Sequence, residues 1–497
     1  MKKFLCVLLL FAVILIAVSC NSSEKSGDGE SKKTAEDKSG ENTPANNSGT
    51  AAGYIYPNEN FKGYEFRVLN LDVTSWGISH MAAEESTGQE LFDAIYLRNR
   101  IVEDKLGFIV KEQFFTEGEV VIERVTTLVN AGIDEFDMII THANEGGPLA
   151  SSGAFMDLYE IDSIDFDSPW WNQGAVNSFE LDKSLYITST DAVIMSTDAT
   201  WIMYFNKNMH EGLGVDDCYE LVKSGKWTMD AMMTMMKAAR RDSDGDGIYS
   251  TADVWGLGTH GSSVGAFIIG AGEQFAYKDE NGYPFIKAPD ERFIAVFAKT
   301  AEMMDYKSGL CFNNHHRTVI KAYDSNIIDQ LDLFENERAL FCNEVLGHTR
   351  TFRAMEKDYG LLPFPKYDES QSEYYSFMIY GTPVFGIPKT VSNPDRSGLI
   401  IEALTAQSLE TISPVYYDTA IRGKYTRDEE SLEMLDYILK NRVYDLSVIF
   451  AWGGIYDKYT EVAARGNSGT NPVNTYEKNI DKTNADIDKT MTFFAGN

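Results

Sequence analysis

The sequence predicts a mixed α/β fold that is divided into two or three domains. Strand-like and helix-like segments alternate along residues 64–140, which is typical of proteins built on a parallel sheet. The chain has 497 residues, which is more than one hydrophobic core usually serves. Hydrophobic residues make up 43% of the chain and aromatic residues 12%, which is ample for the cores that such domains need.

The first globular stretch carries the clearest elements. Residues 64–70 (YEFRVLN) alternate like a half-buried strand, and residues 136–140 (FDMII) form a compact apolar strand pattern. Apolar residues at helical spacing predict helices over 89–106 and 120–130. Strands that are separated by helices indicate a parallel sheet, and ligands bind such sheets beyond the carboxyl ends of the strands.

The rest of the chain yields further elements from the same patterns. Thr228 can cap a helix that ends near Arg240, and four methionines at helical spacing form its buried face. Residues 466–482 are polar and rich in asparagine, which predicts a loop before a last helix near 483–494. Further strands are expected at 185–187, 201–207, 254–257 and 340–345, and further helices at 399–409 and 428–440.

Residues 1–20 have the pattern of a secretory signal peptide: a basic start, an apolar core and small residues at the end. The ending Ala17-Val18-Ser19-Cys20 resembles a bacterial lipobox, which predicts lipidation at Cys20. An ordinary signal peptide or a single anchor helix is the alternative, but the apolar run is short for a membrane span. Residues 21–53 have almost no apolar content, which predicts a disordered tether.

Charge and cysteine content exclude several classes of protein. The net charge of -31 argues against nucleic acid and anionic lipid as partners. After Cys20 the chain holds Cys218, Cys311 and Cys342, which are widely spaced and odd in number. They therefore predict neither a disulfide framework nor a zinc site.

An Asp-rich loop follows the methionine helix and has the spacing of a calcium-binding loop. Calcium takes six to eight oxygen ligands, which alternating carboxylates in a tight loop supply. Gly247 stands where the turn needs a permissive backbone, and position 12 holds an Asp where a calcium-binding hand has a Glu. An acidic, solvated turn without metal is the alternative. The expected ligands of one Ca²⁺ are Asp242, Asp244, Asp246, the Ile248 carbonyl, Ser250 and Asp253.

A set of segments, taken in chain order, resembles one known family. The segments are GIDEFDMII, GAFMDLYEI, DSPWWN, MYFNKNMHEGLG, GKWTMDAM, DSDGDG with VWGLG, FENERALFCNEVLG, DYGLLPFPK and GIPKTVSNPD. The sequence is similar in them to the extracellular solute-binding proteins of family 1, the maltodextrin-binding type of ABC importers. The resemblance covers residues 54–460, and no single motif decides it.

The resemblance implies a two-lobed periplasmic-binding-protein fold (type II-like) with a ligand cleft between the lobes. Lobe 1 would comprise residues 54–195 plus 366–410. Lobe 2 would comprise residues 196–365 plus 411–497. It also implies permease subunits of an ABC transporter as partners.

Composition favours a sugar-like ligand independently of the resemblance. Neutral polyols are held by aromatic faces together with carboxylate, amide and imidazole groups. The chain has 7 Trp and 26 Tyr, and several aromatic residues fall at predicted strand ends near polar side chains. Core packing is the alternative for each, and we assign Trp170 and Trp171 to packing. The expected ligand-binding residues are Trp76, His142, Asn144, Asp191, Trp201, Trp255, His260, Glu344 and Trp452.

Apparent enzyme motifs are weaker. Residues 261–265 match the nucleophile-elbow pattern around Ser263, and Asp324 and His348 follow in the order of a hydrolase triad. No oxyanion motif accompanies them. Residues 256–261 spell G-x-G-x-x-G, but an exported protein meets little dinucleotide. His315 and His316 are adjacent in sequence and not four residues apart, so they make a poor metal-binding pair within a helix.

We therefore expect a lipid-anchored, monomeric receptor on the outer face of the bacterial cell membrane. It would capture a carbohydrate-like solute, an oligosaccharide or related polyol, and deliver it to an ABC import permease without catalysis. Two alternatives remain: a secreted surface esterase or glycoside hydrolase, and a binding protein for peptides or charged metabolites.

Overall fold

The computed structural model describes residues 53–73, 76–116, 119–316, 320, 329–352, 354–416, 429–466 and 471–496. The expected signal peptide with Cys20, nearly all of the expected tether, and Asp324 lie outside these ranges. Within the described ranges, no helix combines the length and the apolar character that crossing a membrane requires.

The first sheet is built from the strands that the amino-terminal stretch predicts, with one strand added from far along the chain. Its order is β12-β3-β1-β2, and β1 pairs in parallel with both β2 and β3. β12 pairs antiparallel with β3. The predicted parallel sheet is thus confirmed. The strands are β1 (Tyr64–Asn70), β2 (Phe108–Phe114), β3 (Met138–His142) and β12 (Pro383–Gly386).

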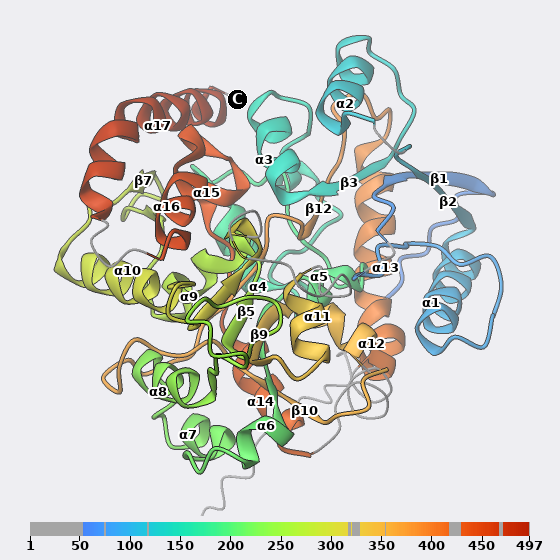
Figure 1. Cartoon of the computed structure of the whole chain (residues 1–497). Helices are drawn as coiled ribbons and strands as arrows, with labels where there is room; N and C mark the ends of the chain where they lie inside the picture. The colour runs from blue at the N-terminus through green and yellow to red at the C-terminus, as the bar shows by residue number, and fades with distance from the viewer. Residues whose placement is uncertain are drawn as a thin grey trace, which may run out of the picture. The chain divides into compact units, whose positions relative to one another are not determined.

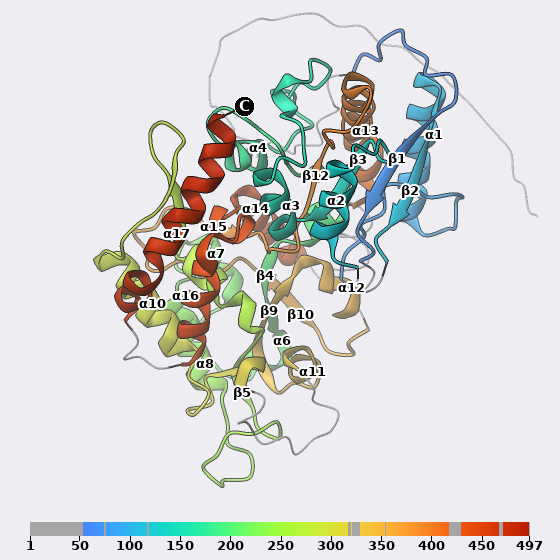
Figure 2. The ribbon, with the colours of Figure 1, turned by 90° about the horizontal axis from the view of Figure 1, so that it is seen from above.

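Helices cross between these strands and cover the sheet. α1 (Glu90–Leu106) connects β1 to β2, and α2 (Val121–Asn130) connects β2 to β3. α13 (Pro394–Val415) packs along α1, and Figures 1 and 2 both show the two helices beside β1 and β2. Asn393 caps α13 by accepting a hydrogen bond from the backbone N–H of Arg396.

The second sheet has the order β10-β4-β9-β5-β8 and mixes both strand directions. β5 runs parallel to β8 and β9, whereas β4 runs antiparallel to β9 and β10. The chain passes from the first sheet to the second after β3 and returns to the first after β10. The strands are β4 (Trp201–Asn206), β5 (Trp255–Thr259), β8 (Cys311–Asn313), β9 (Ala339–Val345) and β10 (Tyr359–Leu362).

Further helices and two small sheets complete the described part. In both Figures 1 and 2 the carboxyl-terminal helices α16 and α17 lie beside α10. The two-stranded sheets are β6 (Ala276–Lys278) with β7 (Pro284–Ile286), and β11 (Ser376–Phe377) with β13 (Arg442–Val443). The remaining α-helices are α3 (Ala143–Ser151), α4 (Gln173–Phe179), α5 (Met195–Asp198), α6 (Lys207–Glu211), α7 (Cys218–Lys223), α8 (Met229–Ala239), α9 (Val264–Gly270), α10 (Glu291–Met303), α11 (Gln330–Glu335), α12 (Thr349–Phe352), α14 (Glu429–Lys440), α15 (Leu446–Ile449), α16 (Ile455–Ala464) and α17 (Pro472–Ala495).

The methionine helix α8 forms as its sequence predicts. The Thr228 hydroxyl accepts a hydrogen bond from the backbone N–H of Ala231 at 3.2 Å, which satisfies one orphan donor of the first turn. The apolar face is buried through Met229, Met232, Met233 and Met236. These methionines are therefore core, which confirms the prediction.

Two sequence predictions of secondary structure are wrong, and one strand of the first sheet was not predicted. Residues 185–187 form no strand, since pairing there is limited to isolated bridges at Leu181–Ser184 and Thr188–Phe385. The strand β2 was not predicted. The predicted loop at 466–482 contains the start of α17, which begins at Pro472 behind an Asn471 cap.

The tryptophan pair of the first lobe packs as predicted. The indole N–H groups of Trp170 and Trp171 donate to the two carboxylate oxygens of Glu402 on α13, at 2.8 Å and 2.9 Å. All three side chains are buried. Removal from water raises the pKa of Glu402 to about 7.

Candidate ligand-binding site

The ends of several strands from both sheets meet around one hollow of about 270 Å³. β3 ends at His142, β5 ends just before His260, and β9 ends at Val345. β4 is antiparallel and pairs Trp201 with Val345, so its first residue reaches the same edge. The lining residues are Val73, Trp76, His142, Trp201, His260, Ser262, Glu344, Val345, His348, Ile379, Tyr380 and Gly381.

A second hollow of about 240 Å³ adjoins the first. Ser262 and Tyr380 line both, so the two form one continuous depression with Tyr380 between them. The other lining residues are Asn144, Ser447, Val448, Ala451, Gly454, Tyr456 and Asp457.

The structure brings together six of the nine residues expected from the sequence. The first hollow contains Trp76, His142, Trp201, His260 and Glu344, and the second contains Asn144. Asp191, Trp255 and Trp452 line neither hollow. Asp191 lies near the phenol of Tyr444, whose pKa it helps to raise after the larger effect of burial.

The two remaining tryptophans are part of the core. The Trp255 indole donates to the Ser250 carbonyl at 2.9 Å, and the Trp452 indole donates to the Thr490 hydroxyl at 2.9 Å. Trp255 opens β5, and β5 runs parallel to β9. Trp255 therefore lies at the opposite end of the strand from His260, away from the hollow.

Trp76 is held in place by the second sheet. The Arg350 guanidinium donates to the Trp76 carbonyl at 2.7 Å. A Cβ atom on Gly347 would lie 1.7 Å from that same carbonyl oxygen, so only a glycine permits this approach. The loop that follows β1 is thus pressed against the turn that follows β9.

The C-terminal part of the loop that carries Trp76 is held by hydrogen bonds to residues of the first sheet and of α1. The Asn70 amide donates to the Ser79 carbonyl at 2.8 Å, and the Glu112 carboxylate accepts from the backbone N–H of Met81 at 2.7 Å. Arg98, which is fully buried, donates to the Met81 carbonyl. Buried polar groups satisfied in this way restrict the loop to one arrangement.

Hydrogen bonds set the tautomers of two histidines in the hollow. His142 Nδ1 lies 3.0 Å from the Gly381 carbonyl oxygen, which can only accept, so Nδ1 carries the proton and Nε2 is an acceptor. His260 Nδ1 accepts from the backbone N–H of Ser262 at 3.2 Å, so in the neutral ring Nε2 carries the proton. In its neutral form, His142 therefore presents Nε2 as a hydrogen-bond acceptor in the hollow.

Two polar atoms of the lining residues are buried and lack a partner within the described part of the chain. They are Trp201 Nε1 and His348 Nδ1. Desolvation lowers the pKa of His348 to about 4, with a smaller contribution from Arg350, so this imidazole is neutral. Desolvation raises the pKa of Glu344 to about 7. Buried donors and acceptors without partners are costly, and a hydroxyl-bearing ligand could satisfy them.

No sequence pattern predicts a ligand-binding role for Ser262, His348 or Tyr380. Ser262 and His348 belong to the apparent hydrolase motif, and both follow strand ends. Tyr380 lies with Ile379 and Gly381 on the loop between β11 and β12, which follows the strands of the second sheet in sequence. The Tyr-Gly-Thr-Pro run at 380–383 marks a turn, but only the fold brings it to this edge.

The hydrolase motif does not form a nucleophile elbow at Ser263. Its hydroxyl is buried, lines neither hollow and donates to the His260 carbonyl at 2.6 Å. No hydrogen bond joins it to His348 within the described residues. Gly256 and Gly258 lie inside β5, where a Cβ on Gly256 would lie 2.6 Å from Met236 Cβ. His316 is occupied with the Ala464 carbonyl at 2.7 Å.

The Asp-rich loop brings three of its six expected ligands together. Ligand atoms of Asp242, Asp244 and Asp246 all lie within 4.8 Å of one another. Backbone N–H groups, that of Gly247 first, lower the pKa of Asp242. Asp253 is buried and instead closes the base of the loop, because it accepts from the backbone N–H groups of Ser243 and Ser250 at 2.7 Å and 2.8 Å. Ser250 is buried beside it, and the Ile248 side chain is 50% exposed.

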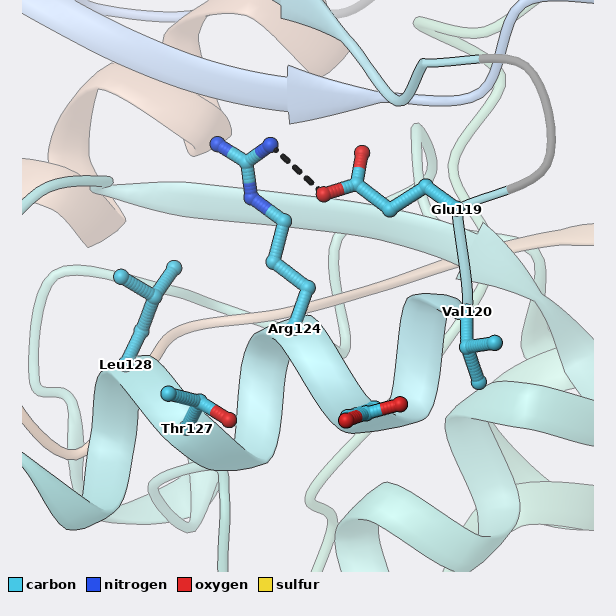
Figure 3. A pocket seen from close by; sticks show the side chains of 6 residues that line it. Glu119, Val120, Arg124, Thr127 and Leu128 are labelled. Atoms are coloured by element: carbon cyan, nitrogen blue, oxygen red, sulfur yellow. Dashed lines mark hydrogen bonds and ion pairs between the residues drawn. The ribbon is translucent and has the colours of Figure 1, made fainter.

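A third hollow, of about 390 Å³, lies over α2 and is drawn in Figure 3. It is lined by residues between Glu119 and Leu128 alone, and Arg124 pairs with Glu119 at 2.9 Å across it. No strand end and no buried polar group contributes to it. It is a surface depression beside one helix, and it carries no functional argument.

The sequence matches no protein-family model, and no curated protein matches it either. Solved structures nevertheless share its fold. The GacH receptor of Streptomyces glaucescens, solved unliganded and with acarbose, is 13% identical, and the match covers 86% of this chain and 99% of that one with a TM-score of 0.54. An ABC substrate-binding protein of Listeria monocytogenes in complex with cycloalternan is 14% identical, with 87% and 100% covered and a TM-score of 0.55.

A sugar transporter protein of Rhizobium etli, solved in an open conformation, is also similar. It is 14% identical, and the match covers 86% of this chain and 99% of that chain with a TM-score of 0.56. Because these matches span nearly the whole length of the neighbours, they confirm the two-lobed α/β fold that the sequence resemblance implies. The lobe boundaries given above stay a prediction.

Proposed function

We propose that the protein is a solute-binding receptor that captures a carbohydrate-like ligand and delivers it to an ABC import permease. The observation that carries the proposal is the convergence of aromatic faces and polar groups from both sheets on one pair of adjoining hollows. Trp76 and Tyr380 supply partly exposed aromatic faces, the buried Trp201 lies beside them, and His142 supplies an acceptor. Sugars need this combination, since their rings have apolar C–H faces and polar rims.

Binding without catalysis fits the same site. The predicted nucleophile Ser263 is buried and bonded to a backbone carbonyl, and three neighbours in fold are described as a receptor, a substrate-binding protein and a sugar transporter. We infer further that the protein acts outside the cytoplasm as a monomer, held to the membrane by lipid on Cys20 and a tether over residues 21–53. The amino-terminal pattern supports this location.

We also propose that the loop from Asp242 to Asp253 binds one Ca²⁺. The grouped oxygens of Asp242, Asp244 and Asp246 support it, since a hard cation favours clustered carboxylates. Asp253 would hold the loop in its shape, because its carboxylate oxygens accept hydrogen bonds from the backbone N–H groups of Ser243 and Ser250.

Titration calorimetry with neutral mono- and oligosaccharides tests the receptor function, and peptides serve as the contrasting ligands. Tyr380 and Tyr283 form a matched pair, because their side chains are 40% and 39% exposed and only Tyr380 lines the hollows. Tyr380→Ala should weaken sugar binding about tenfold or more through lost stacking, and Tyr283→Ala should leave it unchanged. Binding of peptides alone, or turnover of a chromogenic ester that Ser263→Ala abolishes, would overturn the proposal.

A further inference from the structure

The first hollow contains a buried carboxylate without a counter-ion. Glu344 is 8% exposed, and its oxygens accept from the Gln330 amide at 3.0 Å and from the backbone N–H of Val345 at 3.3 Å. Both partners are neutral. Within the described residues, no Lys, Arg or His forms an ion pair with Glu344. A buried charge without a partner is costly, so this position favours a positive ligand group or a proton.

The charges around Glu344 deepen the negative potential there. Asp329, at the start of α11, lies close enough to raise the pKa of Glu344 further, after the larger effect of desolvation. The other titratable neighbours are neutral: Tyr204, Tyr380 and the Cys342 thiol all have raised pKa values to which Glu344 contributes. His142, His260 and His348 also line the hollow, and the His348 imidazole is neutral because desolvation lowers its pKa to about 4.

The positive charge of Arg350, which acts on His348 in the hollow, is already matched. The Arg350 guanidinium donates to both oxygens of Asp198 at 2.8 Å. No Lys or Arg is found among the described residues that line either hollow. In the second hollow Asp457 adds another carboxylate, which also helps to raise the pKa of Tyr380. An anionic ligand would therefore be repelled from both hollows.

Aromatic faces complete the environment that an ammonium group prefers. Trp76, Trp201 and Tyr380 line the same hollow as Glu344. The negative face of an aromatic ring attracts a cation, and the attraction grows when water is excluded. A carboxylate and several aromatic walls without a competing cation are the chemistry that recognises a protonated amine.

We propose that the first hollow binds the ammonium group of an amino sugar, with Glu344 as its counter-ion. This inference rests on the proposed function and narrows the ligand from carbohydrates in general to amine-bearing ones. Gln330 positions the carboxylate through its hydrogen bond, and the second hollow would accommodate an adjoining sugar unit. N-acetylation removes the charge of the amine, so it should remove the preference as well.

The test compares glucosamine with N-acetylglucosamine and glucose, together with the trisaccharide of each, by titration calorimetry on the whole chain at pH 7, where about half of the Glu344 carboxyl groups are ionised. The amine-bearing sugars should bind about tenfold tighter, because one ion pair of this kind corresponds to about that factor. Glu344→Gln should abolish the preference and leave binding of N-acetylglucosamine in place. The control variant Asp230→Asn, which changes an exposed carboxylate outside both hollows, should keep the full preference.

A second measurement uses the unsubstituted protein, so that the test does not depend on the folding of Glu344→Gln. Near pH 6 the Glu344 carboxyl is largely protonated in the free protein, because burial raises its pKa to about 7. Binding of an ammonium should release that proton, which calorimetry in buffers of different ionisation enthalpy detects, and neutral sugars should release none. Equal affinity for all sugars, or a preference that survives Glu344→Gln, would overturn the inference and leave the receptor function intact. Failure of every saccharide to bind would overturn both.

Discussion

The Arg350 guanidinium donates to both carboxylate oxygens of Asp198, each at 2.8 Å. The Asp198 side chain is fully buried and also accepts from the Tyr416 hydroxyl at 2.9 Å and from the backbone N–H of Ile78 at 3.2 Å. One carboxylate thus joins α5 to α12, to the end of α13 and to the loop that carries Trp76. The pair therefore links the loop that follows β1 to the helix that follows β9.

Asp198→Asn should strongly destabilise the fold. The substitution leaves the Arg350 guanidinium, which is 20% exposed, without its charge partner, and a broken buried pair costs about 3–5 kcal/mol. Denaturant unfolding measures the loss. As a control, Asp230→Asn breaks the pair with Lys299 at a carboxylate that is 70% exposed, and should cost about 0–1 kcal/mol. Equal losses in the two variants would contradict the central role of Asp198.

Gly347→Ala should displace Trp76 and weaken ligand binding. The new Cβ would lie 1.7 Å from the Trp76 carbonyl oxygen, and backbone that is pushed apart in a packed contact costs about 1–3 kcal/mol. Calorimetry should show weaker sugar binding together with lower stability. Gly212→Ala is the control, since its Cβ would meet the Met209 carbonyl oxygen at an ordinary 3.6 Å. Unchanged affinity in Gly347→Ala would show that Trp76 does not contact the ligand.

Glu344 should make the ligand-free fold less stable as the pH rises. Its folded pKa of about 7 lies above the ordinary value of 4.5, so the folded state holds a proton that the unfolded state has lost. The contribution of Glu344 is therefore fully present below pH 4.5 and is lost as the pH rises to 7, by about 3 kcal/mol in all. Glu344→Gln should flatten this slope in unfolding free energies measured from pH 4.5 to 7.5. An identical slope in the variant would contradict it.

His348 should act in the opposite direction over a neighbouring range. Its folded pKa of about 4 lies below the ordinary 6.5, so the unfolded state binds the proton first and stability falls as the pH drops from 6.5 to 4. His348→Asn should remove that acid sensitivity, by about 3 kcal/mol at pH 4. The same pH series on the variant measures it, and a variant that loses stability in acid as steeply as the parent would refute the assignment.

Calcium should raise the melting temperature of the protein, and a chelator should lower it, because a ligand of the folded state stabilises that state. Asp244→Asn should reduce the calcium-dependent shift with little effect on the calcium-free protein, since Asp244 is exposed. Asp253→Asn should destabilise the protein with and without calcium, because buried Asp253 closes the loop through backbone hydrogen bonds. No shift with added calcium would refute metal binding.

The fold was predictable wherever one short pattern decided the outcome. The strand β1 and the capped helix α8 match their predicted ranges because alternation and helical spacing are local signals. β2 was missed although Phe108 and Val110 alternate with exposed Ile109 and Lys111. α17 also carried a local signal, an Asn cap before a first-turn Pro, but its polar face masked it.

The hollow was predictable only in part, because strand direction decides which end of a strand reaches it. Trp201 and Trp255 both open strands of the second sheet, yet β4 is antiparallel to β9 and β5 is parallel to it. Trp201 therefore lines the hollow and Trp255 lies in the core. A single sequence contains no signal for that direction, and the predicted return of the chain to lobe 1 at residue 366 does not say which returning residues line the hollow.

The placement of the tryptophans allows ligand binding in the hollow to be followed by intrinsic tryptophan fluorescence. Of the 7 indoles in the chain, Trp76 and Trp201 line it, but Trp76 is partly exposed whereas Trp201 and the other five are buried. An arriving solute would exclude water from the Trp76 indole while the six buried indoles supply the background. Intrinsic fluorescence would therefore report occupancy without any attached dye, and replacing Trp76 with Phe would remove the response.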